Sequence, residues 1–446
     1  MSDNGPVKRA KLVVIIFGGV LTVVLLGIIL SGAFDGSKVR THWGRISPEE
    51  EKSISTATPF RTGFSDSGII QSESPPKVDP STTPIASSNP SLEDGQNNTA
   101  NPARLPTLDV ISPYSLPAGI NPLTGLMPED PSRLERRPMA VKITNFPRYV
   151  RPQSGLTLAD VVYEYYIEDG LTRFIAVFYG KDAEGAGPVR SGRFIDEHVA
   201  HMYHAYLVFK YADPRVYEHM RESDLTDFLV VPGNDNVACP PFTIGKKSVP
   251  DYDNNFFNTL KFQDCLAIQG KDNARQNLRA GFFYTQPPIS NWSAERIYTR
   301  YSPADYHYWD YAPDMNKYVR YQEADDTLGG KPESYALLTD ALTGEAVTAD
   351  NVVVLLISHI FANQFDEEDE VYHIELNGTG NAFIFRDGKA LPAIWWRLTI
   401  NQPLSLTDLT GNPIPLHPGN TFYQVLGKSS YYWAEGNQWH FDFSTP

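Results

Sequence analysis

The chain has 446 residues and a formal net charge of -15. This length is enough for two folded domains and a tail. The acidic balance argues against nucleic acid as a partner, because neutralising phosphates requires clustered Lys and Arg. Aromatic residues make up 12% of the chain. A chain of this composition can bury a substantial core, so we expect its folded part to be globular.

One long apolar segment lies near the start of the chain. Residues 12–34 carry no charge, and about 20 apolar residues are enough to cross a bilayer as a helix. Basic residues just before the segment favour a cytoplasmic tail at residues 1–11 and a large C-terminal part outside the cytoplasm. The alternative is a signal peptide cleaved at Ser31-Gly32-Ala33. We expect a single-pass anchor in the cell membrane.

Residues 35–117 have the composition of a spacer. They are rich in Ser, Thr, Pro, Asn and Asp, and their apolar residues are scattered without a period. Such a segment cannot bury enough surface to offset the entropy lost on ordering. Pro-rich chains are extended. The sequence therefore predicts a disordered linker that holds two folded domains, residues 118–288 and 289–446, away from the membrane.

The first of these domains has alternating strand and helix patterns. Apolar alternation predicts strands at 137–145, 160–167 and 173–179, and Glu168-Asp169-Gly170 is a turn signal typical of a hairpin. A helical pattern at 193–206 precedes a further strand at 206–211. This order predicts an α/β-type N-terminal domain with a mixed sheet.

The second domain has a different pattern. Residues 290–345 are Tyr-rich and irregular, and a buried-looking strand follows at 352–357. Shorter strand patterns, separated by turn signals, follow at 371–376, 382–386, 394–400 and 421–426. We expect a mostly antiparallel β domain here, which makes the whole chain α+β.

Several strings in both domains are recognisable. In the first domain they include Asn121-Pro-Leu-Thr-Gly-Leu126, Ala159-Asp-Val-Val-Tyr-Glu164 and Gly187-Pro-Val-Arg-Ser-Gly-Arg193; in the second, Asn351-Val-Val-Val354 and His417-Pro-Gly-Asn-Thr421. In this order the chain resembles the YerB-like family of bacterial envelope lipoproteins over residues 119–443. The resemblance implies two domains outside the cytoplasm, and it implies no known reaction. The family often has a lipid-modified Cys where this chain has an apolar segment.

Polar residues with ligand chemistry are densest between residues 151 and 193. The candidates are Arg151, Gln153, Ser154, Glu164, Arg173, Arg190, Ser191 and Arg193. The planar guanidinium fork suits carboxylate or phosphate, so converging arginines would bind an anionic ligand such as a peptide carboxylate or an envelope polymer. The alternative is structural pairing with nearby acids, including a cross-strand pair between Glu164 and Arg173.

The chain has no recognisable catalytic motif. Ser154 and Ser191 are not framed by G-x-S-x-G. His198, His201 and His204 have helical spacing but lack the H-E-x-x-H pattern of a metal site. We therefore predict no metal and no cofactor, and the absence of a catalytic motif favours a non-enzyme.

The chain has two cysteines, Cys239 and Cys265. If they pair, they close a loop of about 25 residues, which the chain-entropy model values at roughly 3–4 kcal/mol. Their spacing alone does not show whether they are close enough. Neither follows the apolar segment, so we expect no lipid anchor through a Cys there.

These observations favour a membrane-anchored, extracytoplasmic binding or scaffold protein of the bacterial cell envelope. Its expected partners are the membrane, through residues 12–34, and envelope proteins or cell-wall components. The alternative is an enzyme that acts on cell-wall material.

Overall fold

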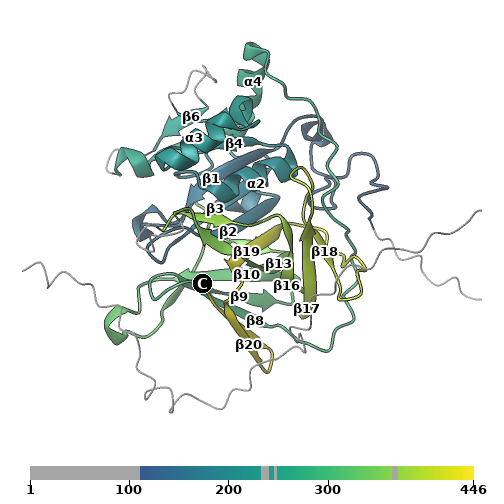
Figure 1. Ribbon diagram of the computed structural model, residues 1–446. Coiled ribbons are helices and arrows are strands. Elements are labelled where there is room, and N and C mark those ends of the chain that lie inside the picture. Colours follow the sequence, from purple (N-terminus) through teal and green to yellow (C-terminus); the bar gives the residue numbers. More distant parts are fainter. Residues whose placement is uncertain (1–110, 233–240, 246–248, 364–369, 446) are drawn as a thin grey trace, which may run out of the picture. The chain divides into compact units, whose positions relative to one another are not determined.

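The computed structural model describes residues 111–445 except 233–240, 246–248 and 364–369 (Figure 1). The predicted anchor, and the predicted linker up to residue 110, lie outside the described residues. Within the described part, no helix combines the length and apolarity that a membrane crossing requires.

The largest element is a mixed ten-stranded sheet with the order β18-β17-β16-β13-β19-β2-β3-β1-β4-β5. Its strands are β1 (Met139–Thr144), β2 (Val161–Tyr166), β3 (Thr172–Phe178), β4 (Tyr206–Val208), β5 (Leu229–Val230), β13 (Asn351–Ile357), β16 (Gly378–Arg386), β17 (Lys389–Arg397), β18 (Ser405–Thr407) and β19 (Thr421–Gly427). The parallel pairing of β19 with β2 joins strands from the two halves of the chain. One sheet therefore runs through both halves.

A second sheet of seven strands comes entirely from the later half. It has the order β11-β10-β9-β8-β21-β20, with β12 paired to β10. Its strands are β8 (Arg296–Arg300), β9 (Tyr306–Ala312), β10 (Lys317–Glu323), β11 (Tyr335–Leu337), β12 (Thr348–Ala349), β20 (Tyr431–Glu435) and β21 (Gln438–Asp442). The expectation that residues 290–345 are irregular is therefore wrong. Two small pairs, β6 (Phe242–Ile244) with β7 (Asn255–Phe257) and β14 (His359–Phe361) with β15 (Tyr372–Ile374), complete the strands.

Three α-helices occur among the described residues: α2 (Phe194–Tyr203), α3 (Pro214–Glu222) and α4 (Thr259–Gln269). Helices α2 and α4 cover opposite faces of the large sheet. On β1, Lys142 reaches Asp196 of α2, whereas Met139 contacts Gln263 of α4. Residues of a strand an odd number apart point to opposite faces. Short 3-10 turns lie at Pro131–Glu135, Arg148–Val150, Leu156–Leu158, Thr226–Phe228, Asp251–Asp253 and Leu328–Gly330.

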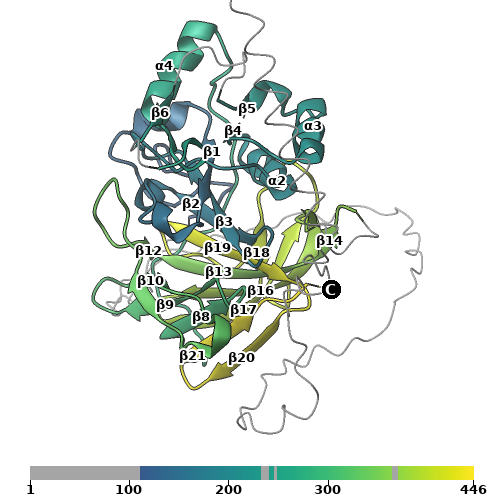
Figure 2. The ribbon, with the colours of Figure 1, turned by 90° about the vertical axis from the view of Figure 1, so that its left-hand side faces the viewer.

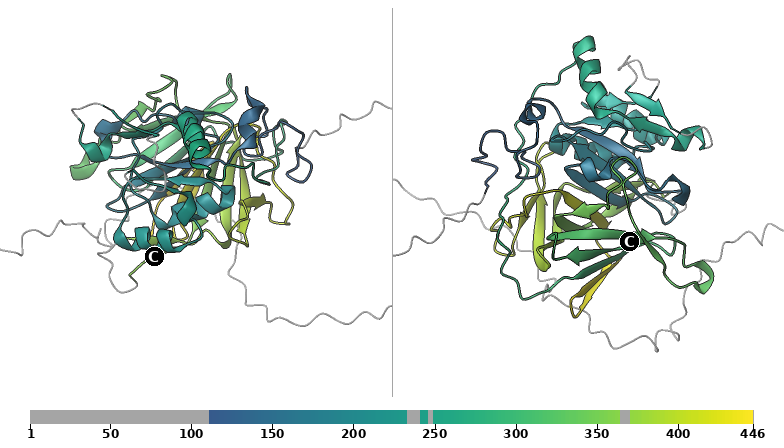
Figure 3. Two further views of the ribbon diagram at one scale, coloured as in Figure 1. Left: turned by 90° about the horizontal axis from the view of Figure 1, so that it is seen from above. Right: turned by 180° about the vertical axis from the view of Figure 1, so that it is seen from behind.

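The second sheet packs on the α4 side of the large sheet, against β2 and β19. Glu164 of β2 points between the sheets to Arg320 of β10, whereas its neighbours Tyr163 and Tyr165 bond to residues of α2. Figures 2 and 3 show the strands of the second sheet at the end of the described chain that lies away from the three helices.

The four strands expected in the earlier half are confirmed. β1, β2, β3 and β4 lie within the predicted ranges or one residue from them, and β2 and β3 form the predicted antiparallel hairpin. In the later half, β17 begins at Lys389 and ends at Arg397, so the strand expected at 394–400 was placed too late. The chain is mixed and rich in sheet.

Candidate functional site

Four of the eight predicted ligand residues line one surface cavity of about 560 Å³: Arg173, Arg190, Ser191 and Arg193. Arg173 is the second residue of β3, and the other three come from the segment that leads into α2. The β2–β3 hairpin turn adds Glu168 and Asp169 to the lining. This arrangement follows from the turn signal in the sequence, because the hairpin brings its acids back beside the start of β3.

The three arginines of this cavity have ion-pair partners. Glu168 serves two of them: its Oε2 accepts from Arg193 Nε at 3.0 Å, and its Oε1 lies 3.6 Å from Arg173 Nη2. Arg190 pairs with Asp253 at 2.8 Å. Burial and the neighbouring Arg193 lower the pKa of Arg173 to about 9, so its guanidinium stays charged at neutral pH. One shared carboxylate leaves this pair of arginines with a positive excess.

A buried lysine lies next to the cavity arginines. Lys142 is fully buried, with its Nζ 3.2 Å from Asp196 Oδ1 and 3.7 Å from the centre of the Tyr165 ring. Burial, and the charges of Arg173 and Arg193, lower its pKa to about 7 against the opposing pull of Asp196. Lys142 therefore lies close enough to Arg173 and Arg193 to be affected by their charge, and its own charge is paired with Asp196.

The rim of the cavity is acidic. Asp169, Asp213 and Glu370 join the lining. Asp213 Oδ1 accepts from Arg215 Nε at 2.9 Å, and Glu370 accepts from the Tyr166 hydroxyl at 3.2 Å. The cavity thus combines a basic wall with an acidic rim, which suits a ligand that carries both signs of charge.

The other four predicted residues lie elsewhere and have structural contacts. Arg151 Nη2 donates to Glu323 Oε1 at 2.6 Å, and the buried Gln153 donates to Asn145 Oδ1 at 3.0 Å. The Ser154 hydroxyl donates to the carbonyl of Gly185, not to a base. These residues do not line the cavity, so the eight predicted residues do not form a single cluster in the structure.

Glu164 corrects one prediction directly. The expected cross-strand pair with Arg173 does not form, because Arg173 lies opposite Tyr165 in the β2–β3 register and Glu164 lies opposite Phe174. Glu164 instead accepts two hydrogen bonds from Arg320, at 2.7 and 2.8 Å, with both side chains fully buried.

This pair belongs to a polar network buried between the two sheets. Thr299, His307 and Gln322 lie side by side on β8, β9 and β10 and face inward. Glu164 and Gln424 lie side by side on β2 and β19 and face them. Sequence reasoning missed all of this network except Glu164. A polar residue in a predicted strand gives no sign of its face until the strand order is known.

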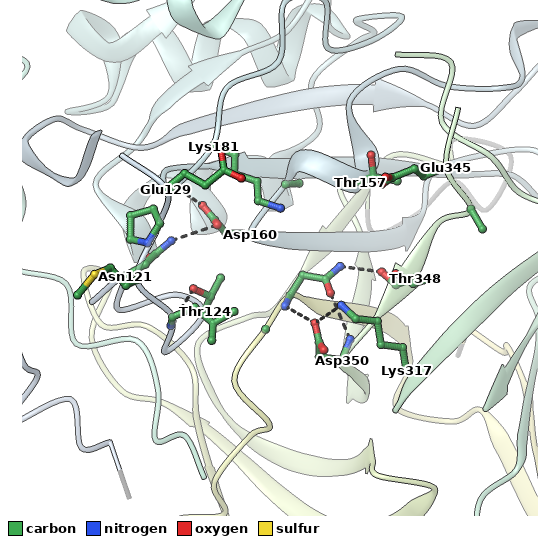
Figure 4. Close-up of a pocket in the computed structure, with 18 residues that line it drawn as sticks. Asn121, Thr124, Glu129, Thr157, Asp160, Lys181, Lys317, Glu345, Thr348 and Asp350 are labelled. Atoms are coloured by element: carbon green, nitrogen blue, oxygen red, sulfur yellow. Dashed lines mark hydrogen bonds and ion pairs between the residues drawn. The ribbon is translucent and has the colours of Figure 1, made fainter. Parts of the chain in front are cut away.

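A second pocket, of about 280 Å³, lies at the amino ends of three parallel neighbours, β13, β19 and β2 (Figure 4). Asp350, Asn420 and Asp160 each come directly before one of these strands. Figure 4 shows Asp160 with Asn121 on one side of the pocket and Asp350 with Lys317 on the other.

The central groups of this pocket have structural contacts. Asp160 accepts from the backbone N–H groups of Tyr179 and Gly180, both at 2.8 Å. Asp350 Oδ2 accepts from Lys317 Nζ at 3.0 Å and from the backbone N–H of Asn420 at 2.9 Å. The lining carries two lysines and four carboxylates, so it disfavours an anion: Glu129, Asp160, Lys181, Lys317, Glu345 and Asp350.

The structure also gives the contacts of the histidines, and of one of the two cysteines, that were singled out from the sequence. His198 Nδ1 lies 3.0 Å from Arg397 Nη1, whereas His201 Nε2 lies 3.6 Å from Glu197. His204 ends α2 in a left-handed conformation. Cys265 is disulfide-bonded. Its predicted partner, Cys239, lies outside the described residues, so that pairing stays a prediction.

Comparison with known proteins identifies the family. Residues 123–270 match the N-terminal domain, and residues 297–423 the C-terminal domain, of a protein family of unknown function, DUF3048. The chain belongs to this two-domain, YerB-like family. It is 26% identical over 308 residues to YerB of Bacillus subtilis (strain 168), whose name classes it provisionally as a lipoprotein; the match covers 68% of this chain and 85% of YerB.

The fold is similar to a solved structure. The crystal structure of YerB from Bacillus subtilis matches with a TM-score of 0.56 at 23% sequence identity. The match covers 69% of this chain and 96% of YerB. Both halves of the described chain therefore share the YerB fold.

Proposed function

We propose that this protein is a membrane-anchored binding protein of the bacterial cell envelope whose arginine cavity takes a carboxylate-bearing ligand. The name of YerB classes that relative provisionally as a lipoprotein, and a lipoprotein is held at a membrane by its lipid. In this chain both cysteines lie far from the N-terminal apolar segment. Residues 12–34 are therefore proposed to be the anchor, with the folded part outside the cytoplasm.

The observation that supports binding is the sharing of Glu168 by two cavity arginines. Arg173 and Arg193 turn their guanidinium groups toward one carboxylate, and guanidinium groups bind carboxylates bidentately. A carboxylate from a ligand would supply the second negative charge. The acidic rim would at the same time favour an amino group on the ligand. A peptide with a free carboxylate and a free amine has both features, and it fits the cavity better than a simple polyanion.

The test compares two peptides that differ only at the C-terminus. A short peptide with a free C-terminal carboxylate, and the same peptide as an amide, are titrated into the full-length protein in mild detergent. We expect the carboxylate form to bind more tightly. A charge-assisted hydrogen bond contributes about 1.5–3 kcal/mol, so Arg193→Gln is expected to weaken binding of the carboxylate form about 10- to 100-fold.

The matched control is Arg275→Gln. Arg275 forms an exposed pair with Glu135 away from the cavity, so its replacement should leave binding unchanged. Equal binding of the two peptides, or equal loss in both variants, would contradict the proposal. The location is tested separately. External protease should digest the folded part on intact cells stripped of their wall, and protection of that part would refute the proposed orientation.

A further inference from the structure

Three side chains with metal-ligand chemistry meet in the core between the two sheets. Glu164 comes from β2, Asp305 from the turn before β9, and His307 from β9 itself. All three are fully buried, and one potential ligand atom from each lies within 4.8 Å of the other two. One imidazole and two carboxylates form a donor set that suits divalent transition metals.

The side-chain carboxylate of Asp305 has no hydrogen-bond partner among the described residues, whereas its backbone is bonded to Tyr301 and Ser302. Both oxygens of its carboxylate are buried and unbonded. The Thr172 hydroxyl is close enough to Asp305 to lower the pKa of its carboxyl, but the hydroxyl has one proton, and it donates that proton to Glu164 Oε1 at 3.0 Å. Buried carboxylates are ordinarily hydrogen-bonded, ion-paired or bound to a metal. Asp305 therefore needs a partner that the described chain does not provide.

The ion pairs of the neighbouring acidic groups also indicate that Asp305 lacks a partner. Glu164 is compensated by Arg320, and Glu323 by two other arginines. Asp305 has no ion-pair partner in the described part of the chain. The acidic group that lacks compensation is thus the one whose oxygens lack hydrogen bonds.

The groups around the cluster resemble the supporting groups of a metal site. Arg320 and Thr172 hold the carboxylate of Glu164, and hydrogen bonds to a ligating carboxylate commonly fix its orientation. The side-chain amide nitrogen of Gln424 contacts His307 Nε2, which is also the ring nitrogen that lies 3.7 Å from Glu164 Oε2, while His307 Nδ1 has no partner among the described residues.

We propose that Glu164, Asp305 and His307 bind one divalent transition-metal ion, of the zinc or manganese type. The site is closed to solvent, because all three side chains are fully buried. It would therefore be structural, and the ion would enter as the chain folds. It would tie β2, from the earlier half of the chain, to β9, from the later half.

The first measurement is the metal content of the full-length protein, purified in detergent from cells grown with zinc and manganese. We expect about one ion per chain, as for a closed structural site. Asp305→Asn keeps the shape of the side chain but removes its charge, and it should lose the ion. Chelation during unfolding and refolding should lower the melting temperature of the wild type and leave that of the variant unchanged.

The matched control is Asp340→Asn. Asp340 is equally buried, but its oxygens accept from the backbone N–H groups of Gly155 and Thr157, both at 2.9 Å. This variant should keep its metal. If Asp305→Asn fails to fold, His307→Gln tests the same site, and cobalt substitution of the wild type should give the visible absorption of a bound ion.

The rival arrangement is a protonated Asp305 without metal. Burial, and the nearby charges of Glu323 and Glu164, raise the pKa of Asp305 well above its usual range. In that case the wild type would contain no metal, chelation would have no effect, and Asp305→Asn would be as stable as the wild type or more so. That set of results would overturn the proposal.

Discussion

The buried pair between Glu164 and Arg320 offers the sharpest test of how the two halves of the chain are held together. Replacing Arg320 with Met removes the guanidinium group but keeps an apolar side chain of similar length. Glu164 would keep its bond from Thr172, at 3.0 Å, and lose both of its bonds to Arg320. Breaking a buried pair in this way costs about 3–5 kcal/mol, because an uncompensated charge stays in the core.

The surroundings of Arg320 place the cost toward the upper end of that range. Its guanidinium carbon lies 5.2 Å from the centre of the Phe174 ring and 5.3 Å from that of Trp309. Such cation–π contacts contribute about 0.5–1 kcal/mol at exposed sites and about 2 kcal/mol or more when desolvated. Arg320 also donates twice to Gln322, at 2.6 and 2.9 Å. Those contacts are lost with the same substitution.

The assay is urea unfolding of the full-length protein in mild detergent with a chelator present, followed by far-UV circular dichroism. The control, Arg296→Met, breaks a pair with Asp310 whose side chains are 33% and 38% exposed. Exposed pairs contribute about 0–1 kcal/mol. The double variant Glu164→Gln with Arg320→Met should recover part of the loss, because no buried charge remains. Equal costs for Arg320→Met and Arg296→Met would refute the reasoning.

Three further predictions concern other parts of the fold. Burial lowers the pKa of Lys142 to about 7, from 10.5 in the unfolded chain. Between these two pH values the unfolded state binds more protons than the folded state, so the stability of the protein should rise with pH. Thermal melts of Lys142→Met at several pH values should lack this rise. Removing residues 289–446 takes away β19 and exposes the edge of β2, so the shortened chain should aggregate in size-exclusion chromatography, whereas co-expression of the missing part should rescue it. Reduction of the disulfide at Cys265 should cost roughly 3–4 kcal/mol in urea unfolding, if the loop has the predicted length of about 25 residues.

The elements that were predictable from sequence are runs rich in apolar residues or are marked by turn signals. β1 to β3 are runs of Val, Ile, Phe and Tyr, and Asp169-Gly170 marks the hairpin. The strands of residues 290–345 lack such a pattern. Their outward side chains include Tyr298, Tyr308 and Tyr321, which lie in line across β8, β9 and β10. Tyr308 and Tyr321 are stacked, with ring centres 4.8 Å apart.

The inward side of the same strands is also unusual. Thr299, His307 and Arg320 are buried there, so neither face follows the rule of apolar inside and polar outside. Local pattern therefore could not identify these strands. The pairing of β2 with β19 was equally inaccessible, because it joins Val161 to Thr421 and a pairing between such distant residues leaves no local signal.

Only some of the candidate residues could be predicted, again because contacts between distant parts of the chain leave no local signal. Arg173, Arg190 and Arg193 are close in sequence, and a hairpin and the start of a helix bring them together. Asp305 and His307 gave no signal, because their neighbour Glu164 lies on a strand of the other half of the chain. The sequence showed which residues could bind a ligand, and only the strand order showed which of these residues lie close together.

The two proposals concern opposite faces of one strand, which makes their tests independent. Thr172 and Arg173 are consecutive in β3: Thr172 points between the sheets and donates to Glu164, whereas Arg173 points to the cavity beside α2. Arg193→Gln therefore removes a group from the cavity and leaves the metal ligands intact, and Asp305→Asn does the reverse. If Arg193→Gln changed the metal content, or Asp305→Asn changed peptide binding by more than its effect on stability, the two faces would be coupled through β3. Thr172→Val would then be the decisive variant, because it removes the hydrogen bond that Thr172 donates to Glu164 beside Arg173.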